Sequence, residues 1–407
     1  MTTRARPHLP RITAAMRETE QVTPLELFFD LVFVLALTQC TQLMSDDPTW
    51  SGLAEGLLIL ALVWWSWVGY SWLTSVIDPE DDAVRVAMFV AMAGLLLVAL
   101  CVPDAFGDLG LAFALSYGVV RAAHVWLFMI ASRDEPGLRH SIVGFTVSTA
   151  IGVALLVAGS TLDGAAQGIV WSLALMLDMA GPYVSGSEGW RIIPGHFAER
   201  HGLILIIALG ESIVAIGVGV GGELSVGQGV AAVVGVGLAA AMWWLYFDVV
   251  ALVAARRLER AAVGREQNEM ARDSYSYMHF LMIAGIILVA LGIKKTLEHV
   301  DDPLKTVPAV ALLGGTALYL LGHVAFRWRH IHTINRQRAG LALVLVAAIP
   351  LALEVSALAT LIAVTVAVWL LIVYETRSYG DRRHDVRHGD FATPALSSTP
   401  GTSPGRG

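Results

Sequence analysis

Charged residues are scarce in this sequence, and their scarcity excludes most classes of soluble protein. Only 15% of the 407 residues are charged and 56% are hydrophobic, whereas roughly a quarter of the residues in an ordinary soluble domain are charged. A soluble helical chain of this length would need a polar face on most of its helices. We therefore expect neither a soluble enzyme nor a nucleic-acid-binding protein.

Cysteine is nearly absent as well. The two cysteines, Cys40 and Cys101, both lie inside apolar stretches, where a thiol packs as a small hydrophobic group. This usage indicates neither a disulfide nor a zinc site, and no cofactor is expected.

The sequence is instead rich in apolar stretches of about 17–25 residues, each long enough to cross roughly 30 Å of hydrocarbon. In lipid each stretch must satisfy its own backbone hydrogen bonds, and it does so as a helix. We expect an all-α membrane protein of about 12 transmembrane helices. The expected spans are 24–44, 53–73, 84–102, 109–132, 139–159, 165–181, 197–220, 227–254, 276–296, 305–326, 339–354 and 356–375.

Basic residues divide unequally between the two sets of alternate loops. Of the 27 Lys and Arg residues, 23 lie in one set and the two tails, whereas the other set holds only Lys294, Lys295 and Lys305. Loops rich in Lys and Arg stay in the cytoplasm. Both termini are therefore expected to be cytoplasmic, which requires an even number of spans.

The two halves of the chain resemble each other in order. Four matches occur: LVFVLALTQC (31–40) with LILIIALGES (203–212), Trp64-Trp65 with Trp243-Trp244, AGLLLVAL (93–100) with AGIILVAL (284–291), and His124-Val125 with His323-Val324. Any one match between apolar segments could arise by chance, but four in one order favour a duplication. Because six is even, we expect two parallel six-helix repeats about an axis along the membrane normal.

This organisation predicts the boundaries of the chain's parts. We expect a cytoplasmic N-terminal arm over 1–22, a first repeat over 23–181, a second repeat over 182–376 and a disordered cytoplasmic tail over 377–407. Within the second repeat, the charged segment 256–274 is expected to form a helix at the cytoplasmic surface.

Ionisable residues inside the expected spans each need an explanation, because a charge in the bilayer centre costs about 2.5–3.5 kcal/mol or more. Glu26 and Asp30 are four residues apart and therefore share one helix face. His196, Glu199 and Arg200 are likewise expected to share a face of the seventh span. The candidate transport or charge-network residues are Glu26, Asp30, Arg121, His124, Asp178, His196, Glu199, Arg200, Glu211 and Asp248.

Asp30 lies about one and a half turns into the first span, so its charge needs a partner or a hydrated path. Arg121 and His124 of the fourth span reach a comparable depth and are its expected partners. Glu211 lies deeper, with no evident cation at its level. Acids outnumber the fixed cations, which favours a cation or proton path, although the arginines could instead neutralise carboxylates and lock helices together.

Two further patterns receive a structural interpretation. The spacing of His196, Glu199 and His201 permits a metal, but the HxxE pattern lacks a convincing third ligand, and no metal is expected. The tryptophans of the second and eighth spans, Trp64 and Trp243 among them, are interpreted mainly as lipid-interface or packing aromatics.

The sequence contains three long motifs: TPLELFFDLVFVLALTQ (23–39), IDPEDDAVR (77–85) and HFAERHGLILIIALGESIVAIG (196–217). Together they resemble the bacterial low-temperature-requirement A family over residues 20–376. The resemblance implies a polytopic protein of the bacterial inner membrane that is linked to growth in the cold. It supplies no molecular mechanism.

The pattern FxDxVFxLALT (28–38) is also similar to the first helix of a potassium-channel family, which carries a Phe-Ser-Asp motif and lines its pore with that helix. Here Phe29 replaces the serine, and Gly202 stands at the position of the seventh span that aligns with Asp30. The likeness therefore concerns one helix.

These observations favour a transport protein, either a channel or carrier for a small cation or a proton-coupled carrier for a small solute. The alternative is a membrane scaffold or sensor that supports growth in the cold and whose buried charges are structural. An intramembrane enzyme would need a nucleophile–base pair or a metal cluster, and no persuasive one is found. The expected partners are the lipid bilayer and the transported cation, proton or solute, and a homo-oligomer is left open.

Overall fold

The computed structural model describes residues 21–378 apart from 134, 185, 187–189 and 221–223, and this part of the chain folds into helices without a named β-strand. The first half comprises α1 (Pro24–Asp46), α2 (Trp50–Val76), α3 (Asp82–Cys101), the short η1 (Val102–Asp104), α4 (Gly110–Ala131), α5 (Pro136–Gly159) and α6 (Gly164–Val184). Nearly all of the expected arm 1–22 and tail 377–407 lies outside the described residues.

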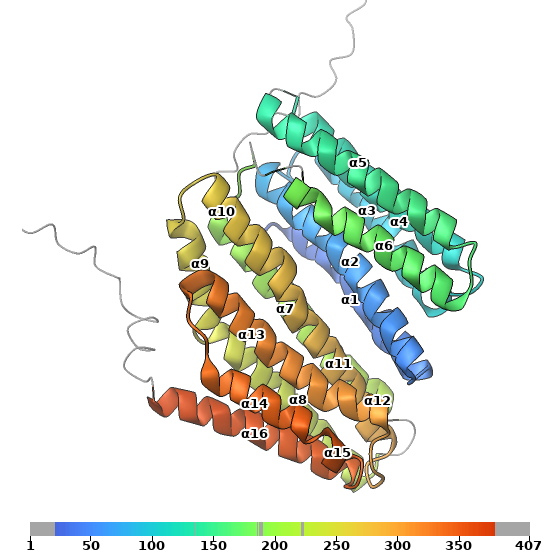
Figure 1. The fold of residues 1–407 in the computed structure, drawn as a ribbon, viewed down its shortest axis with the longest axis vertical. Helices are drawn as coiled ribbons and strands as arrows, with labels where there is room; N and C mark the ends of the chain where they lie inside the picture. Colours follow the sequence, from blue (N-terminus) through green and yellow to red (C-terminus); the bar gives the residue numbers. More distant parts are fainter. Residues whose placement is uncertain (1–20, 134, 185, 187–189, 221–223, 379–407) are drawn as a thin grey trace, which may run out of the picture.

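The second half contains more interruptions (Figure 1). It comprises α7 (Pro194–Gly219), α8 (Val226–Phe247), α9 (Val250–Arg260), α10 (Arg265–Met270), η2 (Ala271–Met278), α11 (His279–Glu298), α12 (Thr306–Ala309), η3 (Val310–Gly314), α13 (Gly315–Ile331), α14 (Arg336–Ala347), α15 (Ile349–Ala352) and α16 (Ala357–Ser378). The segments η2 and η3 are π-helical turns within otherwise continuous rods.

Ten helical segments of the described chain are long and apolar enough to cross a bilayer. The helix α6, which carries Gln167 and Asp178, and the 12-residue α14 fall outside this set. Large apolar side chains such as Leu31, Ile169 and Val233 are exposed around the bundle, as lipid-facing residues are. The chain is therefore a multi-pass helical membrane protein, whereas the expected number of about 12 spans stays a prediction.

The expected surface helix over 256–274 is not formed as one element. Residues up to Arg260 belong to α9, which continues the direction of α8, and residues from Arg265 belong to α10, η2 and α11. A short turn joins the two rods, and Gly264 adopts φ 103° there, a backbone conformation that favours glycine. The charged residues of this segment therefore lengthen two helices, α8 through α9 and α11 through α10 and η2, beyond their apolar parts.

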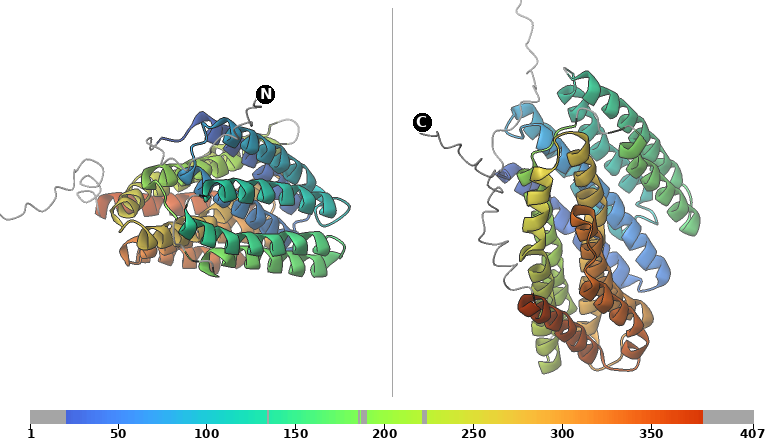
Figure 2. Two further views of the ribbon diagram at one scale, coloured as in Figure 1. Left: turned by 90° about the horizontal axis from the view of Figure 1, so that it is seen from above. Right: turned by 60° about the vertical axis from the view of Figure 1, so that its left-hand side comes forward.

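The loops alternate between two ends of the bundle. Arg85, Arg133 and Arg191 lie at one end, called here the arginine-rich end, and Asp46 and Asp163 lie at the other, called here the acidic end. The helices α1, α2, α7 and α11 occupy the middle of the molecule, with α3 to α6 on one flank and α14 and α16 on the other (Figures 1 and 2).

The two halves meet where α1 packs against α7. Three contacts between them join Glu26 to His196, Asp30 to Arg200 and Thr38 to Glu211. Because the residue numbers rise together along both helices, α1 and α7 run side by side in the same direction. This parallel helix pair, called here the α1–α7 seam, positions most of the charges predicted from the sequence.

Candidate functional site

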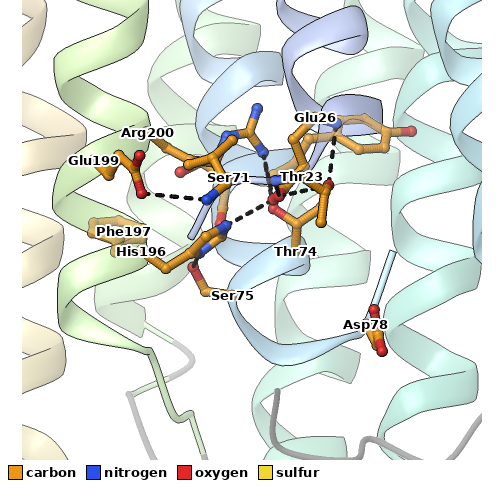
Figure 3. Close-up of polar contacts among 12 residues, drawn as sticks. Thr23, Glu26, Ser71, Thr74, Ser75, Asp78, His196, Phe197, Glu199 and Arg200 are labelled. Carbon is orange, nitrogen blue, oxygen red and sulfur yellow. Dashed lines mark hydrogen bonds and ion pairs between the residues drawn. The ribbon is translucent and has the colours of Figure 1, made fainter. Parts of the chain in front are cut away.

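The α1–α7 seam brings together two carboxylates and two basic side chains near the arginine-rich end. Glu26 and Asp30 are one helical turn apart on α1, and His196 and Arg200 are one turn apart on α7, so each pair projects from a single helix face. All four side chains are fully buried. We call this group the buried charge cluster (Figure 3 shows the part around Glu26).

Asp30 is held by α7 and α2. Its Oδ1 accepts hydrogen bonds from Arg200 Nη2 at 2.5 Å and from the Trp67 indole Nε1 at 2.8 Å. The guanidinium group of Arg200 also lies 5.5 Å from the centre of the Trp67 ring, within cation–π range. The expectation that Arg121 and His124 would be the partners of Asp30 is therefore wrong.

Glu26 combines a structural and an electrostatic contact. Its Oε2 accepts hydrogen bonds from the backbone N–H and the hydroxyl of Thr23, both at 2.9 Å, which closes a capping box at the start of α1. Its Oε1 lies 2.9 Å from His196 Nε2 and 3.5 Å from Arg200 Nη1. The cap thus fixes the rotamer that presents Glu26 to α7 (Figure 3).

Two residues of α2 complete the cluster. Thr74 Oγ1 accepts a hydrogen bond from Arg200 Nη1 at 2.8 Å, and Ser75 Oγ lies 3.3 Å from His196 Nδ1. Arg200 is therefore shared among Glu26, Asp30 and Thr74. Asp30 Oδ2 and Arg200 Nε are nevertheless buried and reach no hydrogen-bond partner among the described residues.

Glu199 lies at the edge of this group. Its side chain is exposed, and its Oε2 accepts a hydrogen bond from the backbone N–H of Val22 at 3.2 Å. Although Glu199 is on α7 next to Arg200, its carboxylate therefore lies outside the buried charge cluster that His196 and Arg200 enter. In the described part of the chain, no group of three His, Cys, Asp or Glu side chains is arranged to hold a metal ion.

A second polar layer crosses the seam toward the acidic end. Glu211 of α7 is buried, and its Oε2 accepts a hydrogen bond from Thr38 of α1 at 2.6 Å. Lys294 of α11 is also buried, donates to Gln42 Oε1 at 2.6 Å and interacts electrostatically with Glu211. Glu211 therefore has a cation nearby, contrary to expectation, although the two do not form a close ion pair.

Apolar side chains separate the two polar layers. Phe33 and Leu37 of α1, Ile204 of α7 and Trp64 of α2 line a void of only about 10 Å³ between them, at the lower limit for a single water molecule. The seam is therefore closed at its middle, with a charged layer on either side.

Arg121 belongs to a separate site within the first half. Its Nη2 lies 2.8 Å from Asp178 Oδ2 of α6 and donates to Thr149 Oγ1 of α5 at 2.9 Å. The ring of His124, one turn away on α4, lies between aromatic rings, and neither of its nitrogens has a hydrogen-bond partner in the described structure. This ion pair joins α4, α5 and α6 away from the seam.

Asp248 caps the C-terminal end of α8 in the second half. It lines a cavity of about 380 Å³ at the arginine-rich end. The ten candidate residues thus fall into the buried charge cluster, its exposed edge, the second polar layer, the Arg121–Asp178 pair and this cavity.

Sequence reasoning missed the neutral residues of the seam. Trp67, Thr74 and Thr38 bind the buried charges directly, yet in an apolar span each is an ordinary packing residue. The sequence pattern predicts for Trp67, as for most of the other tryptophans, a place at the lipid interface or in helix packing. Its position on α2 carried no local signal, because its partner lies 37 residues away on another helix.

The fold and these buried charges define a class: a multi-pass helical membrane protein whose two halves meet along a charged pair of parallel helices. Within that class, the chain belongs to the bacterial low temperature requirement A protein (LtrA) family, whose sequence profile matches residues 21–373. It is 30% identical over 364 residues to an uncharacterized protein of Rhizobium meliloti (strain 1021), covering 84% of this chain and 87% of the relative. No solved structure matches.

Proposed function

We propose that this protein is a transport protein that moves a small cation, or a solute together with protons, along the α1–α7 seam. The observation that carries this proposal is the second oxygen of Asp30. It is a buried carboxylate oxygen without a hydrogen-bond partner among the described residues, and a position of this kind is where a proton or cation binds.

The arrangement along the seam supports a gated carrier over an open pore. The buried charge cluster and the Glu211 layer are separated by packed apolar residues, so neither layer is in continuous aqueous contact with the other. A carrier needs such a closed middle, which opens to each side in turn. The potassium-channel likeness of the first helix places Asp30 on a pore, whereas here Asp30 binds Arg200 of α7.

The contacts of Glu26 favour a second candidate, a scaffold or sensor with structural charges. Glu26 is bonded to its own helix cap and to both basic residues of α7, which would lock α1 against α7 without any transport. In either case we propose that no chemical reaction is catalysed and that the protein resides in the bacterial inner membrane.

Flux measurements on the purified protein in liposomes test the proposal. We expect wild-type protein to move protons, Na⁺ or K⁺ down an imposed gradient, and Asp30→Asn and Glu211→Gln to abolish that flux while both variants insert and accumulate normally. Asparagine and glutamine keep the size and the accepting oxygen, so Trp67 and Thr38 retain their hydrogen bonds. In Asp30→Asn, Glu26 stays 3.5 Å from Arg200 as its counter-charge.

Glu199→Gln is the matched control, because Glu199 is an acid on α7 next to Arg200 whose side chain is exposed and not buried in the charge cluster. It should transport as the wild type does. If Asp30→Asn and Glu211→Gln also retain full transport or full support of growth in the cold, the buried acids are structural and the scaffold function takes precedence.

A further inference from the structure

The charges of the buried charge cluster balance only when one proton is added. Glu26 and Asp30 are acids, and Arg200 is the member of the four that is always positively charged. The fourth member, His196, is positive only when protonated, and histidine gains and loses a proton near neutral pH. With both carboxylates ionised, one further proton makes this fully buried group neutral, and an uncompensated buried charge is costly.

The contacts of the cluster fit a proton on His196. Glu26 Oε1 lies 2.9 Å from His196 Nε2 but 3.5 Å from Arg200 Nη1. Arg200 instead lies 2.5 Å from Asp30 Oδ1. The ionisable groups that act on the two acids are these basic residues and, for Asp30, Glu26 itself. Each acid thus has one close basic partner, the imidazolium for Glu26 and the guanidinium for Asp30.

Asp30 Oδ2 is a second position for the same proton. This oxygen is buried without a hydrogen-bond partner among residues 21–378 as described, whereas Oδ1 accepts from Arg200 and Trp67. A metal cation needs several protein oxygens in place of its hydration shell, but the nearby oxygens of Glu26 and Thr74 already accept hydrogen bonds. A proton needs a single lone pair, so Oδ2 suits a proton better than Na⁺ or K⁺.

Moving the proton changes the pairing of Arg200. When Asp30 is neutral and His196 is uncharged, Glu26 is the ionised acid of the cluster. Arg200 Nη1 already lies 3.5 Å from Glu26, and Thr74 accepts a hydrogen bond from the same nitrogen at 2.8 Å. Arg200 therefore has two arrangements, one paired with Asp30 and one with Glu26, and a local charge change of this kind shifts helix packing when it favours one of two states.

One face of α2 connects the two proton positions. Trp67, Ser71 and Ser75 follow one another at intervals of four residues and therefore share this face. Trp67 donates to Asp30, and Ser75 Oγ lies 3.3 Å from His196 Nδ1 (Figure 3 includes Ser71 and Ser75). The Ser71 hydroxyl between them is buried and has no hydrogen-bond partner in the described part of the chain. A hydroxyl both accepts and donates, so Ser71 is placed to pass on a proton.

We propose that the ion moved along the seam is the proton, and that it exchanges between His196 and Asp30 through the hydroxyls of Ser75 and Ser71. The proton leaves Nδ1 of the imidazolium and binds Asp30 Oδ2. One imidazolium and one carboxylate become a neutral imidazole and a carboxylic acid, and the total charge of the cluster is unchanged. The inference rests on the proposed transport function and names its ion.

Infrared spectroscopy of the full-length protein in liposomes tests the choice of ion. Protonated Asp30 gives a carboxylic C=O band, identified by its loss in Asp30→Asn, and we expect this band to have the same pH midpoint in choline chloride, NaCl and KCl. A cation that competes for Asp30 at about one hundred times its Kd would lower the midpoint by about two pH units. A fall of about one unit or more, or no band at any pH at which the protein stays folded, would overturn the proton assignment.

His196→Gln removes one of the two proton positions. Arg200 should then pair with Glu26, and the midpoint of Asp30 should rise by at least about one pH unit because its carboxylate loses positive charge nearby. His323→Gln is the matched control, because His323 is a buried histidine of α13 whose ring packs on two tyrosines. It should leave the midpoint unchanged. Equal shifts in the two variants would show that His196 does not share the proton.

Ser71→Ala tests the route. It should slow the appearance of the Asp30 band after a pH jump about tenfold or more and leave the midpoint unchanged. Ser66→Ala is the matched control: its hydroxyl is also fully buried on α2 without a partner in the described structure, but it lies five residues from Ser71 and therefore on another face. Equal rates in the two variants would overturn the route through Ser71.

These infrared measurements do not depend on transport, so the two proposals can fail separately. Proton exchange as expected in liposomes that take up neither protons, Na⁺ nor K⁺ would refute transport of ions while the exchange between the two residues stands. Uptake of Na⁺ or K⁺ without protons, lost in Asp30→Asn, would refute the proton as the ion and leave transport along the seam in place.

Discussion

Asp30 is bonded through one oxygen to residues that come from two other helices, α2 and α7. The sequence indicates that a charge at this depth needs a partner, because a lone carboxylate in hydrocarbon is costly. It does not indicate which arginine supplies the partner. Arg121 and Arg200 are both embedded in apolar spans at suitable depths, and only the packing of α1 against α7 decides between them.

The choice of partner leads to a prediction for Arg121. Arg121→Ala should lower the stability and accumulation of the protein by removing the partner of buried Asp178, a loss of about 3–5 kcal/mol for a buried pair. Adding Asp178→Asn should partly restore both, because the stranded charge is removed as well. The measurements are the thermal unfolding midpoint and the amount of protein in the membrane.

The matched double variant is Arg121→Ala with Asp30→Asn. It should show no recovery, since Asp30 is bonded to Arg200 and not to Arg121. Recovery with Asp30→Asn and none with Asp178→Asn would mean that the pairing described here is incorrect.

At the scale of helices, most of the elements could be predicted from the sequence, because apolar length is a local property. The eleventh expected span is interrupted between α14 and α15, beside Pro350, because proline lacks the backbone N–H that a continuous helix needs. The division of 256–274 into α9, α10 and η2 was not predicted, since its charged residues fit one surface helix equally well. The π-helical turns of η2 and η3 have no counterpart in the hydrophobic pattern.

The crossing of α11 and α13 depends on a glycine. A Cβ atom at Gly285 would lie 2.7 Å from Gly315 O and 2.7 Å from Tyr319 N, both backbone atoms. Backbone cannot move aside as a side-chain end can, so Gly285→Ala should destabilise the protein by about 1–3 kcal/mol or more. Thermal unfolding of the purified variant measures this effect.

Gly94 and Gly210 provide graded controls. A Cβ atom at Gly94 would meet the side chain of Val120 at 2.8 Å, so Gly94→Ala should cost less than Gly285→Ala. A Cβ atom at Gly210 would meet nothing within 4 Å, and Gly210→Ala should be neutral or stabilise by up to about 1 kcal/mol. A smaller loss for Gly285→Ala than for Gly210→Ala would contradict the close crossing of α11 and α13.

Across the whole molecule, several contacts support the proposed duplication. Gly94 faces Val120 where α3 crosses α4, and Gly285 faces Tyr319 where α11 crosses α13. The offsets between the corresponding residues are 191 and 199, the same as for the sequence matches in these helices. The packing order agrees as well: α1 packs on α2 and α3 as α7 packs on α8 and α11, and α2 packs on α6 as α8 packs on α16.

The parallel course of α1 and α7 bears on how the repeats are oriented. If the halves were inverted repeats, their first helices would run in opposite directions across the membrane. They run in the same direction, as the pairs Glu26–His196 and Thr38–Glu211 require. Parallel repeats with an even number of spans place the start of each half on one side of the membrane, and the excess of arginine there predicts the cytoplasm.

Cysteine labelling of the full-length chain in intact cells tests this topology. Cys40 and Cys101 are buried and are first replaced by alanine. Single cysteines are then introduced at four exposed sites, as Asp46→Cys, Arg133→Cys, Asp163→Cys and Arg191→Cys. We expect a membrane-impermeant maleimide to label the two sites at the acidic end in intact cells, and the two at the arginine-rich end only after lysis.

Labelling of Arg191→Cys but not Arg133→Cys in intact cells would place these two loops on opposite sides. The helices α5 and α6 both lie between these loops, and of the two only α5 is long and apolar enough to be a candidate span. That result would therefore mean that α6 does not cross the membrane. The first half would then have fewer than six spans, which rules out two parallel six-helix repeats.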